Sequence, residues 1–167
     1  FFMMRNVGVR NVTDPSSEMS QIGLVTTTIP LALFALFQMK FAIITPSLIT
    51  GAFAERVHFA GYLLFMILWT VVVYCPLAHC TWHPEGLFGM MHVHDYAGGI
   101  VVHAASGIAA LAGAMFLGRR RESRSDNKPA NVPFVLLGAA LLWLGWFGFN
   151  GGSSLAADGI AISAFLN

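Results

Sequence analysis

Long apolar stretches alternate with short polar segments along this chain. Apolar blocks cover about residues 29–53, 57–78, 97–117 and 132–150, and a fifth block begins at 155–167. At 1.5 Å per residue, each complete block can cross a hydrocarbon core of about 30 Å as a helix. The pattern predicts four membrane-spanning helices and the start of a fifth. Because the first block contains Pro30 and Pro46, we expect it to be tilted, or broken near one of them.

The polar segments between the blocks predict an orientation. The segment 119–128 holds five of the nine basic residues, and Arg56 lies in the short turn between the first two blocks. Basic residues accumulate in the cytoplasmic loops of membrane proteins. We therefore expect 119–128 and the Arg56 turn on the cytoplasmic side of a multi-pass protein of the cell membrane, with 79–94 outside.

Composition favours the same class. The chain is 56% hydrophobic and 10% charged, whereas a soluble domain has about 25% charged residues, and its mean hydropathy is +0.69. We expect an all-α, polytopic transmembrane helix bundle. With most basic residues in one loop, no nucleic-acid partner is indicated. The start lacks a signal-peptide pattern and the end falls inside an apolar block, which predicts an internal piece of a longer protein.

His103 is the one ionisable residue within the block 97–117. A titratable side chain inside an apolar helix suggests a functional site, because it is costly in hydrocarbon without a partner. Gly99 and Gly107, one turn to either side, would allow another helix to approach closely. Two interpretations stay open: a packing histidine that finds its hydrogen bonds in the bundle, or a group that handles protons or contacts a ligand.

Asp95 and Trp82 stand near the predicted outer ends of two blocks. Asp95 is expected to be an N-cap that accepts a backbone N–H, and it could add negative potential to a cation site. Trp82 is either an interfacial anchor or a cation–π platform for an ammonium-like ligand.

The first block also carries polar residues. Gln38 can hydrogen-bond across helices. Lys40, near mid-span, costs about 2.5–3.5 kcal/mol on insertion scales and therefore needs a carboxylate, a snorkelling route or a wet cavity.

Neither a metal nor another cofactor is indicated. Cys75, His79, Cys80 and His83 have a spacing that matches no common zinc site, and the two cysteines are expected to be buried free thiols. A haem protein would need paired axial histidines, and only His103 lies at mid-span. At 143–153 the glycines predict close backbone contacts or a helix break, and a break is tolerated at membrane depth only where the backbone is buried or lines a cavity.

Three segments together resemble one family. DYAGGIVVH at 95–103 resembles the D-(F/Y)-A-G-G-x-x-V-H signature of ammonium transporters (the Amt/Mep family, related to Rh proteins). FQMKFAIITP at 37–46 with GAFAER at 51–56, and GWFGFNGGS at 145–153, are similar to two more of its blocks. The resemblance covers about residues 34–167. It implies part of an eleven-span fold built from two inverted repeats, from the third span to the start of the seventh, in a homotrimer with one pore per subunit.

The resemblance also implies roles for single residues. These are ammonium recruitment by Trp82, Ser153 and the vestibule carboxylate Asp95, gating by Phe41 and Phe149, lining of the pore by Gln38 and Trp146, and conduction by His103 as the first of two facing pore histidines. Lys40 departs from the family, which usually has an apolar residue there.

The predicted function is therefore transport of ammonium or ammonia through a narrow apolar pore, not enzymatic catalysis. Two conducted species stay open: ammonia released from ammonium, and intact ammonium. The alternatives are an ammonium sensor of the same fold and a non-transporting fragment. A cytosolic regulatory protein is a further expected partner.

Overall fold

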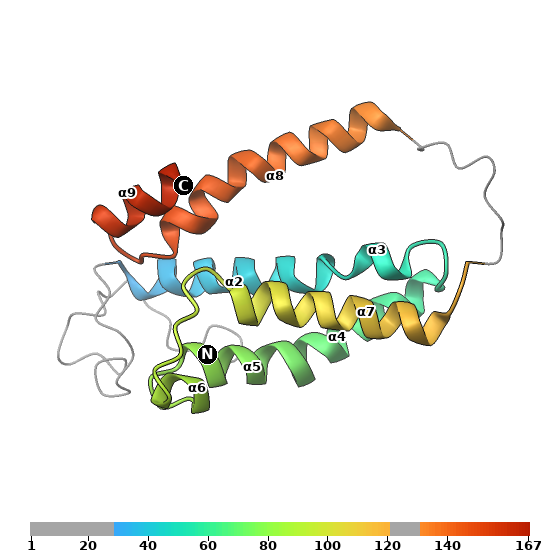
Figure 1. The fold of residues 1–167 in the computed structure, drawn as a ribbon, viewed down its shortest axis with the longest axis horizontal. Helices are drawn as coiled ribbons and strands as arrows, with labels where there is room; N and C mark the ends of the chain where they lie inside the picture. Colours follow the sequence, from blue (N-terminus) through green and yellow to red (C-terminus); the bar gives the residue numbers. More distant parts are fainter. Residues whose placement is uncertain (1–28, 121–130) are drawn as a thin grey trace. The chain divides into compact units, whose positions relative to one another are not determined.

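The computed structural model describes residues 29–120 and 131–167. They fall into two compact units, unit 1 ending at Arg119 and unit 2 beginning at Arg120. Regular structure in the described residues is helical (Figure 1). Four helical segments there are long and apolar enough to cross a membrane, namely Ala32–Phe53, Phe59–Met90, Gly99–Leu117 and Val132–Gly152. The predicted class, a transmembrane helix bundle, is confirmed.

The first segment of unit 1 contains α2 (Leu31–Ser47) and the short α3 (Thr50–Phe53). The first helix ends one residue after Pro46, so the break falls near the second of the two prolines considered above. Thr45 donates its hydroxyl to the Phe41 carbonyl at 2.6 Å, which gives the buried hydroxyl a partner within the helix.

The second and third segments each contain a π-helical stretch. The second runs through α4 (Phe59–Trp69), the π-helix η2 (Thr70–Tyr74) and α5 (Cys75–Trp82), and a short α6 (Leu87–Met90) follows. The third consists of the π-helix η3 (Gly99–Ala104) and α7 (Ala105–Leu117). The second segment continues well beyond residue 78, and neither π-helical stretch was predicted.

The helices of unit 1 pack along one another (Figure 1). The first helix, α2, contacts α4, η2, η3 and α7, while α5 contacts η3 and α6. The buried apolar side chains are Phe41, Ile49, Trp69, Tyr74, Val101 and Val102. Many other large apolar side chains are exposed, Phe116 by 90%. Such a surface suits lipid, which is as apolar as the side chains themselves.

One end of unit 1 is held together by contacts between α3, α4 and α7. The Phe53 ring packs on Tyr62 and Phe65, at centroid distances of 5.8 and 4.9 Å. Arg56 Nη1 donates to the carbonyl oxygen of Gly118, just after α7, at 2.9 Å. The predicted cytoplasmic turn is thereby attached to the end of the third segment.

Gly113 gives this end a testable packing constraint. A Cβ at Gly113 would lie 2.5 Å from Cζ of Phe53, so Gly113→Val forces the ring out of its place. Overpacking of this kind costs about 1–3 kcal/mol in the free energy of unfolding. Thermal unfolding of the full-length protein in detergent measures the loss. Gly61→Ala, whose Cβ would meet only Val57 at 3.9 Å, is the control, and Phe53→Leu should restore most of the stability of the valine variant. Equal stabilities for Gly113→Val and the parent would contradict this packing.

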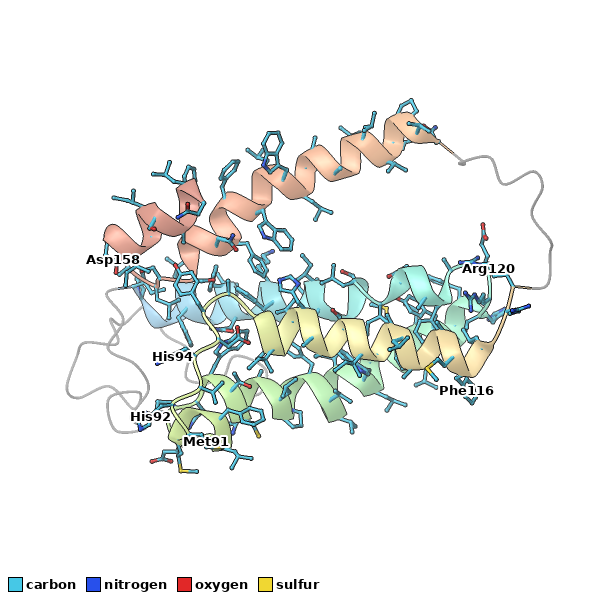
Figure 2. The ribbon with its side chains drawn as sticks, viewed as in Figure 1. Met91, His92, His94, Phe116, Arg120 and Asp158 are labelled. Carbon is cyan, nitrogen blue, oxygen red and sulfur yellow. The ribbon has the colours of Figure 1, made fainter. Side chains whose placement is uncertain are left out.

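Unit 2 contains α8 (Val132–Gly152) and α9 (Gly159–Leu166). The glycine-rich run 143–153 stays helical to Gly152, where α8 ends, so no break interrupts the helix earlier in the run. A Cβ at Gly151 would meet the Ala161 carbonyl oxygen at an ordinary van der Waals distance of 3.5 Å, and a Cβ at Gly145 or Gly148 would meet open space. Asp158, labelled in Figure 2, caps α9 by accepting from the Ala161 N–H at 2.8 Å. Hydrogen bonds from the Ser154 hydroxyl and from Ala161 hold the pKa of Asp158 below its ordinary value of 3.8.

Candidate functional site

The Asp95 carboxylate is bound by four consecutive backbone N–H groups. Gly98 and Gly99 donate to Oδ1 at 2.7 and 2.6 Å, while Ile100 and Val101 donate to Oδ2 at 2.8 and 3.0 Å. A carboxylate offers about four lone-pair sites, so the backbone fills them. The expected simple N-cap is corrected in one respect: the N-cap residue is Gly98, and the carboxylate reaches the helix from three residues earlier.

Gly98 makes this reach feasible. Its φ of 88° lies in the left-handed region, and a Cβ would lie 2.5 Å from Cγ2 of Val102. Its carbonyl accepts from the N–H groups of both Val102 and His103, at 2.8 and 2.9 Å. The doubled acceptance begins the π-helical stretch η3. A glycine is therefore required here for both its backbone conformation and its size.

Trp82 is joined to the same loop. Its indole Nε1–H donates to the Asp95 carbonyl oxygen at 2.8 Å. The Phe41 ring meets the Trp82 ring edge-on, with centroids 5.5 Å apart and planes at 81°. Phe41 also packs on Phe37 at 4.9 Å and is only 3% exposed, while Trp82 is half-buried. Three predicted site residues, Phe41 on α2, Trp82 at the end of α5 and Asp95 in the loop before η3, thus form one cluster.

The other predicted residues of unit 1 lie on the helices that carry this cluster. His103 belongs to η3, two residues beyond the last N–H bound by Asp95, and its side chain is exposed. Gln38 is half-buried on α2 and Lys40 is exposed there. The Lys40 ammonium is therefore not enclosed within the unit, in keeping with a snorkelling route or a wet cavity.

The Cys–His spacing does not produce a metal site in the part of the chain that the structure describes. No group of three or more metal-binding side chains forms there. His79 and His83 stack at 4.6 Å, and His83 Nδ1 accepts from the Glu85 N–H at 3.1 Å. Cys80 is half-buried, but Cys75 is exposed, so its predicted burial is wrong. Figure 2 shows His92 and His94 at the same end of unit 1 as α6, with Phe116 at the opposite end.

Unit 2 brings its own three predicted residues together. The rings of Trp146 and Phe149 stack at 4.6 Å with planes 14° apart. Ser153 donates its hydroxyl to the Phe149 carbonyl oxygen at 2.7 Å. All three side chains are half-buried.

These observations define the class of protein. Four apolar helical segments, one carrying a histidine just beyond a carboxylate–indole–phenyl cluster, describe a polytopic membrane protein with a polar site at one end of its helices. The particular family follows from the whole sequence. The sequence model of the Ammonium Transporter Family matches residues 1–167, and the chain belongs to this family.

Individual relatives agree with the family match. The chain is similar to an ammonium transporter of Bacillus subtilis (strain 168), with 48% identity over 145 residues, covering 87% of this chain and 35% of the relative. It is also 48% identical to ammonium transporter 1 of Dictyostelium discoideum, covering 81% of this chain and 30% of the relative. An ammonium transporter of Aquifex aeolicus (strain VF5) is also 48% identical, covering 84% of this chain and 33% of the relative. The chain spans about a third of the length of these curated relatives.

Some features of the site were not found from the sequence. The link from the Trp82 indole to the Asp95 carbonyl has no sequence signal, because it joins residues 13 positions apart through a loop. The binding of the Asp95 carboxylate by four backbone N–H groups does have a sequence signal. Two glycines follow an aspartate directly before an apolar helix, which is the pattern of a backbone that must turn tightly around a carboxylate.

Proposed function

We propose that the protein carrying this chain moves ammonium or ammonia across a membrane. The observation that carries the proposal is the family match over residues 1–167. The names of the similar proteins, which are ammonium transporters, support the substrate. The cluster of Phe41, Trp82 and Asp95 supports a recruitment site for a small cation.

In this proposal the cation is recruited by an aromatic face and a hydroxyl. The Trp82 ring is fixed by its bond to the Asp95 carbonyl, and an indole face attracts ammonium with about 0.5–2 kcal/mol. The Ser153 hydroxyl hydrogen goes to the Phe149 carbonyl, so its lone pairs remain to accept from an ammonium N–H. Asp95 has its lone pairs filled by backbone, and therefore acts through its negative charge and by holding residues 98–101.

Beyond recruitment, conduction relies on an apolar passage. Phe41 and Phe149 are the proposed gating rings, Gln38 and Trp146 line the route, and His103 is the conducting group. Ammonium and potassium have the same charge and similar size, so attraction alone discriminates poorly between them. A narrow apolar passage penalises an ion that keeps its charge. Ammonium can give a proton to water at the mouth of the passage and cross as ammonia, with the His103 imidazole as hydrogen-bond partner.

The setting of the site is proposed on the distribution of charge. Six of the nine basic residues lie at 119–128 and Arg56, which supports a cytoplasmic position for both in a protein of the cell membrane. The assignment of 1–167 as part of an eleven-span domain, the homotrimer and the cytosolic regulatory protein stay predictions.

The proposal is tested by uptake of radiolabelled methylammonium by the full-length protein, in cells that lack their own ammonium transporters. The parent protein should restore saturable uptake, and excess potassium should not inhibit this uptake. His103→Ala should lower the uptake rate by about tenfold or more, because one hydrogen bond worth about 1.4 kcal/mol is lost along the route.

His58→Ala is the matched control, because His58 is exposed at the N-cap of α4, where its side chain makes no capping bond, far along the chain from η3. It should leave uptake unchanged at the same amount of protein in the membrane. If the parent binds ammonium but restores no uptake, the sensor alternative replaces the transporter. If His103→Ala transports like the parent, His103 is not the conducting group.

A further inference from the structure

Thr81 carries a buried hydroxyl without a hydrogen-bond partner. Among the described side chains, only Arg56 Nε and Thr81 Oγ1 are buried and unpartnered. Thr81 is the more enclosed of the two, since its side chain is only 4% exposed. A buried polar group without a partner costs free energy comparable with a lost hydrogen bond. Such a group in a folded protein calls for an explanation.

Other hydroxyls in these helices show what Thr81 forgoes. Thr45, Thr70, Ser106 and Ser153 each donate to the carbonyl four residues earlier, at 2.6 to 2.7 Å. The corresponding acceptor for Thr81 would be the Leu77 carbonyl. A threonine in a helix can normally reach the carbonyl four residues earlier by rotation about χ1. In Thr81 the hydroxyl does not make this bond and remains enclosed.

The surroundings explain why bulk water does not reach it. Thr81 lies in the last turn of α5, which packs against η2, η3 and α6. The turn after α5 closes tightly over the helix end, because a Cβ at the buried Gly86 would lie 2.4 Å from the His79 carbonyl oxygen. The next residue, Trp82, is fixed by its bond to the Asp95 carbonyl. The hydroxyl is thus enclosed at the end of α5, on the residue next to Trp82 in the chain.

We propose that Thr81 Oγ1 is a polar contact of an internal binding position for one small hydrogen-bonding molecule, either water or ammonia. Both molecules donate and accept hydrogen bonds, and a hydroxyl can meet either of them with its donor or a lone pair. Water would complete the outer end of α5 as a structural component. Binding of ammonia at this position rests on the proposed transport function, whereas binding of water does not.

The test compares Thr81→Val, which keeps the shape and removes the hydroxyl, with Thr81→Ser, which keeps the hydroxyl. The full-length protein is unfolded thermally in detergent, with and without ammonium chloride. Thr81→Val should lower the unfolding midpoint by about 1–3 °C, while Thr81→Ser should stay closer to the parent. A loss that is equal with and without ammonium identifies water. A loss seen only with ammonium identifies ammonia.

Thr70→Val is the matched control, because its hydroxyl is already satisfied by the Met66 carbonyl, and its effect should not depend on ammonium. A Thr81→Val midpoint equal to or above that of the parent in both conditions overturns the proposal. A high-resolution density map decides independently: a peak about 2.6–3.2 Å from Thr81 Oγ1 supports it, and a hydroxyl turned to the Leu77 carbonyl without such a peak overturns it. Uptake is measured separately, so a failed binding position and a failed transport function are distinguishable.

Discussion

Replacing Asp95 by alanine is expected to lower the free energy of unfolding by about 2–4 kcal/mol. The reason is the number of bonds lost at once. The N–H groups of Gly98, Gly99, Ile100 and Val101 all lose their acceptor. Val101 is fully buried, so water cannot replace the carboxylate there. The negative charge that favours the positive end of the helix is lost as well.

Asparagine should fail at Asp95 almost as badly, although it is as good as aspartate at an ordinary N-cap. Its amide oxygen can keep two of the four bonds, but its NH₂ group then faces two backbone donors. Asp158 provides the matched comparison, since the Ala161 N–H and the Ser154 hydroxyl both donate to one of its oxygens, Oδ1, which an amide oxygen can replace. Asp158→Asn should therefore be tolerated.

Thermal unfolding of the full-length variants in detergent measures both effects, and amide hydrogen exchange at residues 98–101 locates them. Exchange there should accelerate in Asp95→Ala and in Asp95→Asn, and not in Asp158→Asn. Equal stabilities for Asp95→Asn and the parent would mean that the four backbone bonds do not hold this helix start.

The membrane-spanning segments could be predicted because they depend on composition alone. A block of apolar residues about 20 long has no stable arrangement in lipid other than a helix, whatever its neighbours are. Segment ends were less accurate for the same reason. The second segment continues through α5 to Trp82, past His79, whose polarity marked a loop in the sequence.

The site was predictable by residue type and not by geometry. The motif at 95–103 indicated Asp95 and His103, but the role of the carboxylate depends on the left-handed backbone at Gly98. The cluster joins Phe41 on α2 to Trp82 at the end of α5 and to the loop that carries Asp95. Such contacts result from helix packing, which a periodic apolar pattern does not specify when nearly every face is apolar. The two π-helical stretches escaped prediction because they differ from α-helix only in their hydrogen bonds.

Trp82 gives the second large expected effect, and it separates two roles of one side chain. The indole N–H donates to the Asp95 carbonyl, and the ring face is the proposed platform for ammonium. Trp82→Leu removes both, and Trp82→Phe keeps an aromatic face without the N–H. Leucine should raise the KM for methylammonium uptake by about 3- to 30-fold, corresponding to about 0.5–2 kcal/mol of cation–π attraction.

Phenylalanine should raise KM by less, yet both variants should lose similar thermal stability, because both leave the Asp95 carbonyl without its indole donor. Uptake kinetics and thermal unfolding of the full-length protein provide the two readouts. Trp143→Leu is the matched control: Trp143 is 71% exposed on α8, and its replacement should leave KM unchanged. If phenylalanine and leucine at residue 82 raise KM equally, the position of the Asp95 loop governs recruitment rather than the aromatic face. If neither raises KM, Trp82 only supports the fold, because a recruiting platform cannot be removed without weakening the capture of the cation.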